Sequence, residues 1–166
     1  MKRVFLLMLI LPLLCSCSKE RDIPLIERYP ITVTGELSHN GSCYAVSITL
    51  KGPGCGTVAI DAPENLSGYS FKVDNSSIWV YYDNVEAPLS AGVTDYPFLN
   101  IIKAMSVSRP DFEYSRREKD AVIYHYMADD ADIAVYTTLS DTAPTRIEYV
   151  KESVCVRLDI TNIVYN

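Results

Sequence analysis

The fold is decided by the stretch ITVTGELSHNGSCYAVSITLK, residues 31–51. Its first part alternates apolar Ile31, Val33 and Leu37 with polar residues, which is the period of a half-buried strand. An Asn-Gly pair follows at positions 40 and 41, and this pair is the strongest short signal for a hairpin turn. The alternation then resumes up to Lys51. The stretch therefore predicts two antiparallel strands that turn one apolar face towards a core.

Short alternating runs separated by turn residues continue through most of the chain, whereas only residues 98–105 have the pattern of a helix. We expect about ten short strands in total. The sequence predicts an all-β fold with minor α content, namely one curved antiparallel sheet, or half-barrel, with a short helix on its concave face. The strands expected beyond the first hairpin lie at residues 57–62, 69–73, 78–82, from 112 onwards, 122–127, 133–138, 147–151 and 154–160.

Two segments indicate where the core of this fold lies. Residues 98–105, FLNIIKAM, carry a broad apolar surface and predict a helix that cannot face water. Asp95 is its expected cap, and Pro97 is expected in its first turn. Residues 78–82, IWVYY, are apolar on both faces, so we expect this strand in the centre of the sheet rather than at its edge.

The start of the chain has the pattern of a lipoprotein signal peptide. A basic start precedes an apolar run at residues 4–14, which is too short to span a bilayer. The sequence LCSC at residues 14–17 resembles a bacterial lipobox and predicts that Cys17 becomes the diacylated N-terminus. Cys15 fits less well, because Leu14 would then occupy the small-residue place. The alternative is an ordinary secretory signal.

The remaining residues are the length of one domain. Removal of the expected signal, residues 1–16, leaves 150 of the 166 residues, enough for a sizeable core. Residues 17–28 are charged and without periodicity, and we expect them to form a lipidated N-terminus and tether. Residues 29–166 are expected to form a single β-rich half-barrel domain.

The charge of the mature chain limits its partners. Without residues 1–16, 13 basic residues face 21 acidic ones, a net charge of −8. Nucleic acid and anionic lipid headgroups repel such a domain, so we expect no nucleic acid partner. We expect a lipid anchor on Cys17 and a place on the extracytoplasmic face of a bacterial membrane, either the inner (cell) membrane or the outer membrane.

Three cysteines follow Cys17, namely Cys43, Cys55 and Cys155. An odd number leaves at least one thiol unpaired within the chain. One disulfide is compatible with the sequence, which does not choose among the three pairings. We interpret these cysteines as small side chains on strands rather than as a disulfide framework.

The sequence offers little for catalysis or metal binding. His39 and His125 lack a second histidine or a cysteine at ligand spacing, and no serine lies in a G-x-S-x-G motif. Residues 129–132, DDAD, lack the glycine and the distal glutamate of a calcium loop. We therefore expect a protein that is not an enzyme and that holds no metal and no cofactor.

The aromatic and apolar side chains of the two core segments suggest a ligand cavity. Pockets for apolar ligands are lined by many large apolar groups and few polar ones. Core packing explains the same residues without a ligand, so both interpretations stay open. The expected cavity residues are Trp79, Tyr81, Phe98, Ile102 and Met105.

A family resemblance rests on three further stretches. These are residues 62–71 (APENLSGYSF), the short hairpin at 74–77 that leads to Tyr81-Tyr82, and residues 87–92 (APLSAG). Together with the signal peptide and the strands, they resemble small bacterial membrane lipoproteins related in layout to the lipoprotein-carrier (LolA/LolB-like) superfamily. The resemblance spans residues 31–163.

This resemblance implies a half-barrel whose concave face, closed by helices, holds acyl chains. The sequence shows one helix where the carriers have several, and the family supplies no catalytic residues. We therefore expect a membrane-anchored, non-enzymatic lipoprotein that binds an acyl chain, or the lipid of another lipoprotein, in an apolar cavity. The alternative is a protein-interaction module of a cell-envelope complex with a filled core and no ligand.

Overall fold

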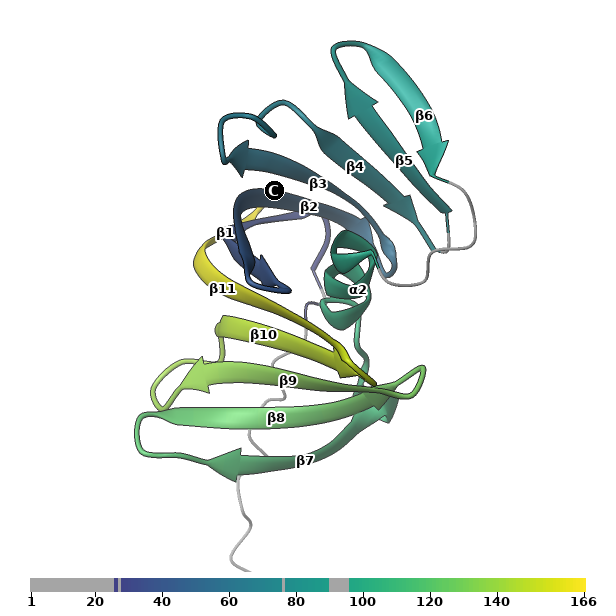
Figure 1. Ribbon diagram of the computed structural model, residues 1–166. Helices are drawn as coiled ribbons and strands as arrows, with labels where there is room; N and C mark the ends of the chain where they lie inside the picture. The colour runs from purple at the N-terminus through teal and green to yellow at the C-terminus, as the bar shows by residue number, and fades with distance from the viewer. Residues whose placement is uncertain (1–25, 27, 76, 90–95) are drawn as a thin grey trace, which may run out of the picture.

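The computed structural model describes residues 26, 28–75, 77–89 and 96–166. Eleven antiparallel strands form one sheet, and one α-helix and one short 3-10 helix lie between β6 and β7 (Figure 1). The elements are β1 (Ile31–His39), β2 (Ser42–Gly52), β3 (Cys55–Ala62), β4 (Ser70–Asp74), β5 (Ser77–Tyr82), β6 (Val85–Leu89), α2 (Pro97–Ala104), η1 (Arg109–Asp111), β7 (Phe112–Arg117), β8 (Ala121–Ala128), β9 (Ala131–Thr138), β10 (Pro144–Lys151) and β11 (Val154–Tyr165).

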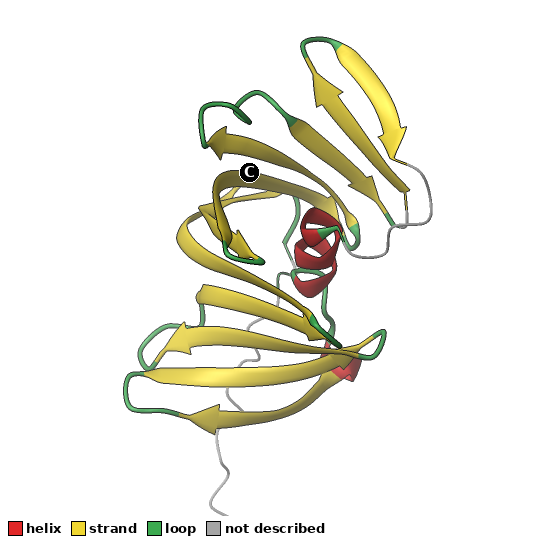
Figure 2. Ribbon diagram, viewed as in Figure 1, coloured by secondary structure: helices red, strands yellow, loops and turns green. Residues whose placement is uncertain are grey.

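The sheet is strongly curved and open. Its strand order is β6-β5-β4-β3-β2-β1-β11-β10-β9-β8-β7, so β6 and β7 are its two edges. The two ends of the sheet bend towards each other, and α2 lies between them on the concave side (Figure 2). The predicted fold class, a curved antiparallel sheet with a short helix on its concave face, is confirmed.

The first hairpin has the predicted structure. Ile31, Val33 and Leu37 of β1 are completely buried, and β2 pairs with β1 from Ile31↔Leu50 to His39↔Ser42. The turn residues Asn40 and Gly41 both have positive φ, 49° and 78°, as a tight hairpin turn demands. The concave face of the sheet therefore continues from β1 into β2 without a change of register.

The centre of the sheet pairs the first strand with the last. β1 and β11 are antiparallel from Ile31↔Tyr165 to His39↔Val156, with an irregularity between Thr34 and Gly35. A Cβ atom at Gly35 would lie 2.2 Å from the main-chain oxygen of Asp159, so only glycine allows the two backbones to approach this closely. An irregularity of this kind, a β-bulge, bends the strand that contains it.

Two expectations for the β5–β6 edge of the sheet need correction. Residues 85–89, which are not among the expected strands, form the edge strand β6, and Pro88 is acceptable there because an edge strand has no neighbour on one side. Consequently β5 is the second strand from the edge rather than a central one. Its apolar side chains on both faces do not reflect a position in the middle of the sheet.

The helix lies where the sequence predicts it, one residue earlier. It spans Pro97–Ala104, and Met105 is its C-terminal cap. The expected capping residue, Asp95, lies outside the described residues. The residue before the helix is Tyr96, whose side chain makes no capping hydrogen bond, while Pro97 stands in the first turn as predicted.

Three further features of the fold bear on the expectations from the sequence. Ile26, which falls in the expected tether, is only 9% exposed and belongs to the hydrophobic core. The thiols of Cys43, Cys55 and Cys155 are free, in keeping with their interpretation as ordinary strand residues. No helix among the described residues combines the length and the apolar character needed to cross a bilayer.

The close approach at Gly35 generates a prediction. Gly35→Ala should lower the free energy of unfolding by at least about 2 kcal/mol, in the upper part of the range for overpacking, because the backbone of β11 cannot move away from the new methyl group without breaking the β1–β11 ladder. Gly52→Ala is the matched control, since a Cβ atom there meets nothing within 4 Å. Urea denaturation at pH 7 measures both. Equal stability of the two variants would contradict the proposed close packing.

Candidate functional site

The concave face of the sheet is occupied by α2. The ring of Phe98 stacks on Phe71 of β4, with centroids 4.3 Å apart, and meets the ring of Tyr44 of β2 edge-on at 6.1 Å. Aromatic pairs in these geometries add about 0.5–1.5 kcal/mol to the burial of their area. Phe98, one of the expected cavity residues, therefore fixes the first turn of the helix against the sheet.

The following turn of the helix is packed equally closely. Ile102 and Met105 are buried to 0% and 2% exposure. A Cβ atom at Gly56 of β3 would lie 3.0 Å from Cδ1 of Ile102 and 2.8 Å from the main-chain oxygen of Thr49. Gly56 thus leaves room for the Ile102 side chain and nothing more. The structure brings Phe98, Ile102 and Met105 together as core residues.

Trp79 and Tyr81 lie on the other face of the sheet, so the prediction that they share a cavity with the helix is wrong. Side chains alternate between faces along β5, and buried Ile78 pairs with buried Val73 on the helix side. Trp79 pairs instead with Lys72, whose ammonium group lies 5.3 Å from the centre of the indole ring. Tyr81 donates a hydrogen bond from its hydroxyl group to Glu86.

Hollows open beside this core among the described residues, and none of the five expected cavity residues lines the three that are described below. One of them has a volume of about 320 Å³ and lies between the start of the domain, the β2–β3 turn and the connection from α2 to β7. We call it the apolar hollow. Its lining residues are Ile26, Tyr29, Pro53, Ser106, Val107, Ser108 and Arg109.

Hydrogen bonds hold the walls of the apolar hollow in place. The main-chain N–H of Gly54 donates to Oγ of Ser106 at 2.8 Å, and the same hydroxyl group donates to the main-chain oxygen of Ile102 at 2.7 Å. Ser106 therefore ties the β2–β3 turn to the end of α2. In the next turn, the carboxylate of Asp111 accepts from the N–H and the hydroxyl group of Ser108, at 2.7 and 2.6 Å. Burial raises the pKa of Tyr29, so the wall that it forms is uncharged at neutral pH.

A second hollow, of about 250 Å³, lies between α2 and the β10–β11 turn, and we call it the polar hollow. It is lined by Asn100, Lys103, Tyr149, Lys151, Glu152, Ser153 and Val154. A third, of about 130 Å³, lies at the β3–β4 end of the sheet beside Cys55 and Asp74. There the Cys55 thiol donates to the carboxylate of Asp74 at 3.3 Å. This hydrogen bond raises the pKa of the thiol, which makes Cys55 a poor nucleophile at neutral pH.

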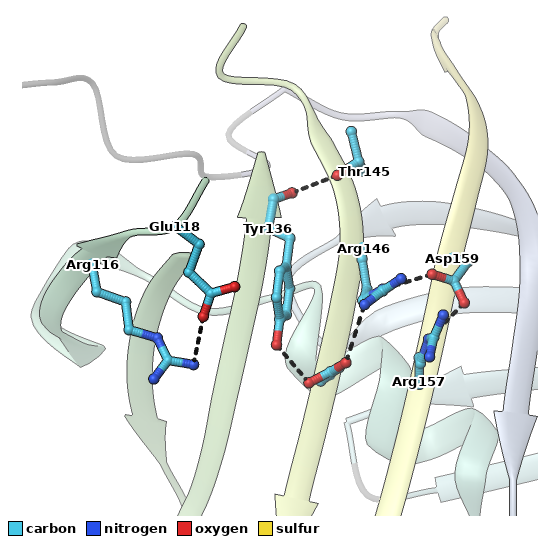
Figure 3. A network of polar contacts seen from close by, with 8 residues as sticks. Arg116, Glu118, Tyr136, Thr145, Arg146, Arg157 and Asp159 are labelled. Carbon is cyan, nitrogen blue, oxygen red and sulfur yellow. Dashed lines mark hydrogen bonds and ion pairs between the residues drawn. The ribbon is translucent and has the colours of Figure 1, made fainter. Parts of the chain in front are cut away.

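The outer face of β9, β10 and β11 carries a polar network (Figure 3). Asp159 accepts from Nε of Arg146 at 2.7 Å and from Nε of Arg157 at 2.6 Å, and Glu148 accepts from the hydroxyl group of Tyr136 at 2.9 Å. Burial raises the pKa of Asp159, but the hydrogen bonds from Arg157 and Arg146 outweigh it and hold the pKa below its ordinary value. These groups pair with one another across neighbouring strands, which supports the sheet register.

The two histidines stand apart from the hollows. Nδ1 of His125 lies 3.4 Å from Oδ1 of Asp132, and the ring stacks on Tyr114 with centroids 4.5 Å apart. His39 lies within 3.1 Å of the main-chain oxygen of Cys155. Among the described residues, no three histidine, cysteine or carboxylate side chains lie close enough to hold a metal ion.

Several solved structures resemble the domain in fold. A LolA superfamily protein from Nitrosomonas europaea matches with a TM-score of 0.47 and 15% identity, over 82% of this chain and 84% of that chain. A domain from Vibrio parahaemolyticus, described as outer membrane lipoprotein-sorting, matches with a TM-score of 0.46 and 10% identity, over 82% and 85% of the two chains.

A third structure, an uncharacterised conserved protein from Thermus thermophilus, matches with a TM-score of 0.44 and 14% identity, over 82% and 78% of the two chains. A scan against protein-family models found no match, and a search of the curated proteins found none either.

The packing under α2 generates a second prediction. Ile102→Trp should lower the free energy of unfolding by about 1–3 kcal/mol, because the larger side chain has no empty space to enter between α2 and β3. Val150→Trp is the control, because Val150 is 40% exposed on the outer face and a substitution there should change stability by less than about 0.5 kcal/mol. Urea denaturation compares the two. An Ile102→Trp variant as stable as the parent would reveal space under the helix.

Proposed function

We propose that the chain is a lipid-anchored, non-enzymatic protein of the bacterial envelope, whose domain binds one apolar chain of a lipid or of another lipoprotein in the apolar hollow. The observation that carries this proposal is the hollow itself, about 320 Å³ in volume and walled by Ile26, Tyr29, Pro53 and Val107. Ligand pockets begin at about 300 Å³ and are mostly apolar with a few placed polar groups. Arg109 supplies a cation among the lining residues.

The proposed ligand follows from the chemistry of this lining. Burial of each methylene group contributes about 0.8 kcal/mol, so an apolar chain gains more in this hollow than a polar ligand does. The acidic domain repels anionic headgroups, so apolar contact rather than charge attraction should provide the affinity. One chain is the capacity that we propose, because α2 already fills the centre of the concave face.

The proposed anchor keeps the hollow close to the membrane. Eight residues separate Cys17 from Ile26, and Ile26 lines the hollow. A fully extended segment of this length spans about 30 Å. A domain tethered in this way can exchange a chain with the bilayer surface while its own acyl chains stay inserted.

A second candidate function, the protein-interaction module, is favoured by the β5–β6 hairpin. Tyr82 and Val85 flank its turn and are 47% and 65% exposed, and the ring of Tyr69 stacks on Tyr82 at 4.1 Å. A hairpin that has exposed apolar side chains and includes an edge strand is suited to a protein partner. Binding of a partner at this hairpin, together with an unoccupied apolar hollow, would favour this function.

A fluorescent fatty acid tests the apolar hollow. We expect saturable binding to a full chain that carries Cys17→Ser, which removes the chain's own lipid from the assay. Val107→Trp should weaken binding at least about tenfold by filling the hollow, because loss of two buried methylene groups alone costs about 1.6 kcal/mol. Val150→Trp, on the outer face, is the matched control and should bind as the parent does. Absence of saturable binding, or equal binding by both variants, would exclude the apolar hollow as the site.

The anchor is tested separately. Cys17→Ala should prevent lipid attachment, so the protein should either keep its apolar signal peptide or be released into the aqueous phase of a phase-partition assay, in both cases without an acyl chain. Mass spectrometry of the N-terminal peptide identifies the acylated residue. The matched control is Cys15→Ala, which should be processed and anchored like the parent. Loss of the anchor in Cys15→Ala instead would assign lipidation to the other cysteine.

A further inference from the structure

The polar hollow contains a buried amide that the fold does not explain. Asn100 is 2% exposed in a helix whose other core-facing residues are apolar, and it lines the hollow. Its main-chain N–H donates to the oxygen of Tyr96, and its side-chain amide, which makes no hydrogen bond to another described residue, is open to the hollow rather than sealed in the core. An amide that opens into the hollow can both donate a hydrogen bond to a ligand and accept one from it.

Two lysines come from different elements to the rim of the same hollow. Nζ of Lys103, in the last turn of α2, lies 3.4 Å from the carboxylate of Asp129, and Nζ of Lys151, at the end of β10, donates to the main-chain oxygen of Asp129 at 2.6 Å. Asp129 belongs to the β8–β9 turn and thereby holds both ammonium groups beside the hollow. An ammonium group has three donors, so each lysine retains donors for a ligand.

The donors around the hollow match one kind of anionic group. Lys103, Lys151 and the amide of Asn100 supply three donating groups from two elements, and a phosphate presents several acceptor oxygens in a tetrahedral arrangement, whereas a carboxylate presents two. The β10–β11 turn adds the hydroxyl group of Ser153 and the carboxylate of Glu152. The carboxylate would repel a bare anion, but it would accept a hydrogen bond from a hydroxyl or amino group next to the phosphate.

We infer that the polar hollow is a binding site for a small phosphate ester that carries a neighbouring amino or hydroxyl group. The phosphate contacts Lys103, Lys151 and Asn100, and the amino or hydroxyl group contacts Glu152. Such an ester occurs free in solution and also as the headgroup of a phospholipid. This inference is independent of the apolar hollow, whose walls contain none of these residues.

Isothermal titration of the full Cys17→Ser chain with phosphoethanolamine tests the inference. We expect saturable binding at low salt that Lys151→Gln and Asn100→Leu each weaken at least tenfold. Lys119→Gln, in the exposed β7–β8 turn, removes the same charge elsewhere and should leave affinity unchanged.

A second titration identifies the source of the ester. Dihexanoyl phosphatidylethanolamine below its micelle concentration should bind with the same sensitivity to Lys151→Gln if the site holds a lipid headgroup. Binding of phosphoethanolamine alone, with that sensitivity, assigns the site to a free ester. Absence of saturable binding of either probe, or equal affinity of the Lys151→Gln and Lys119→Gln variants, would overturn the inference.

Discussion

The burial of α2 against the concave face is the interaction on which the rest of the structure depends. An open sheet of this curvature turns a row of apolar side chains inwards, and no second sheet covers them. The helix supplies that cover with Phe98, Ile101, Ile102 and Met105, all of which are buried. Full burial of such a side chain contributes about 1.5–3 kcal/mol. The helix therefore does for this half-barrel what a second layer does for other sheets.

Because the helix fills the centre of the concave face, the two hollows proposed as binding sites lie beside it. The apolar hollow begins where α2 ends, at Ser106 and Val107, and the polar hollow lies along its side at Asn100 and Lys103. The same short helix is thus the wall of one hollow and the neighbour of the other. Among the buried residues of α2, only Asn100 is polar, and it lies beside the polar hollow.

The alternation of polar and apolar side chains made the first hairpin predictable. The sequence did not reveal which face of β5 meets the helix. In residues 31–51, polar and apolar side chains take opposite faces, so the register and the buried face follow together. In β5 both faces are apolar, and alternation then gives no sign of which face meets the helix. Trp79 was assigned to the wrong face for this reason, and β6 was missed because it is short and contains Pro88.

The two hollows could not be predicted from the sequence. Ile26 stands in a charged, proline-bracketed segment without periodicity, so nothing marked it as buried. Asn100 and Lys151 are far apart in the chain, and only the packing of α2 onto the end of β10 brings them together. Residues that a single helix or strand carries were predictable from their spacing, whereas sites assembled from turns were not.

The pairing of β1 with β11 has a consequence for how the chain acquires its fold. The hydrogen bond between Thr161 and Thr34 joins residues 127 positions apart, and it lies at the middle of the sheet rather than at an edge. Loop closure over such a distance is slow, and proteins dominated by pairings between distant residues fold slowly. Synthesis begins at the N-terminus and delivers β11 last, so the two half-sheets cannot join until the final residues are made. The topology thus delays the pairing of β1 with β11, and with it the joining of the two half-sheets, until the chain is nearly complete.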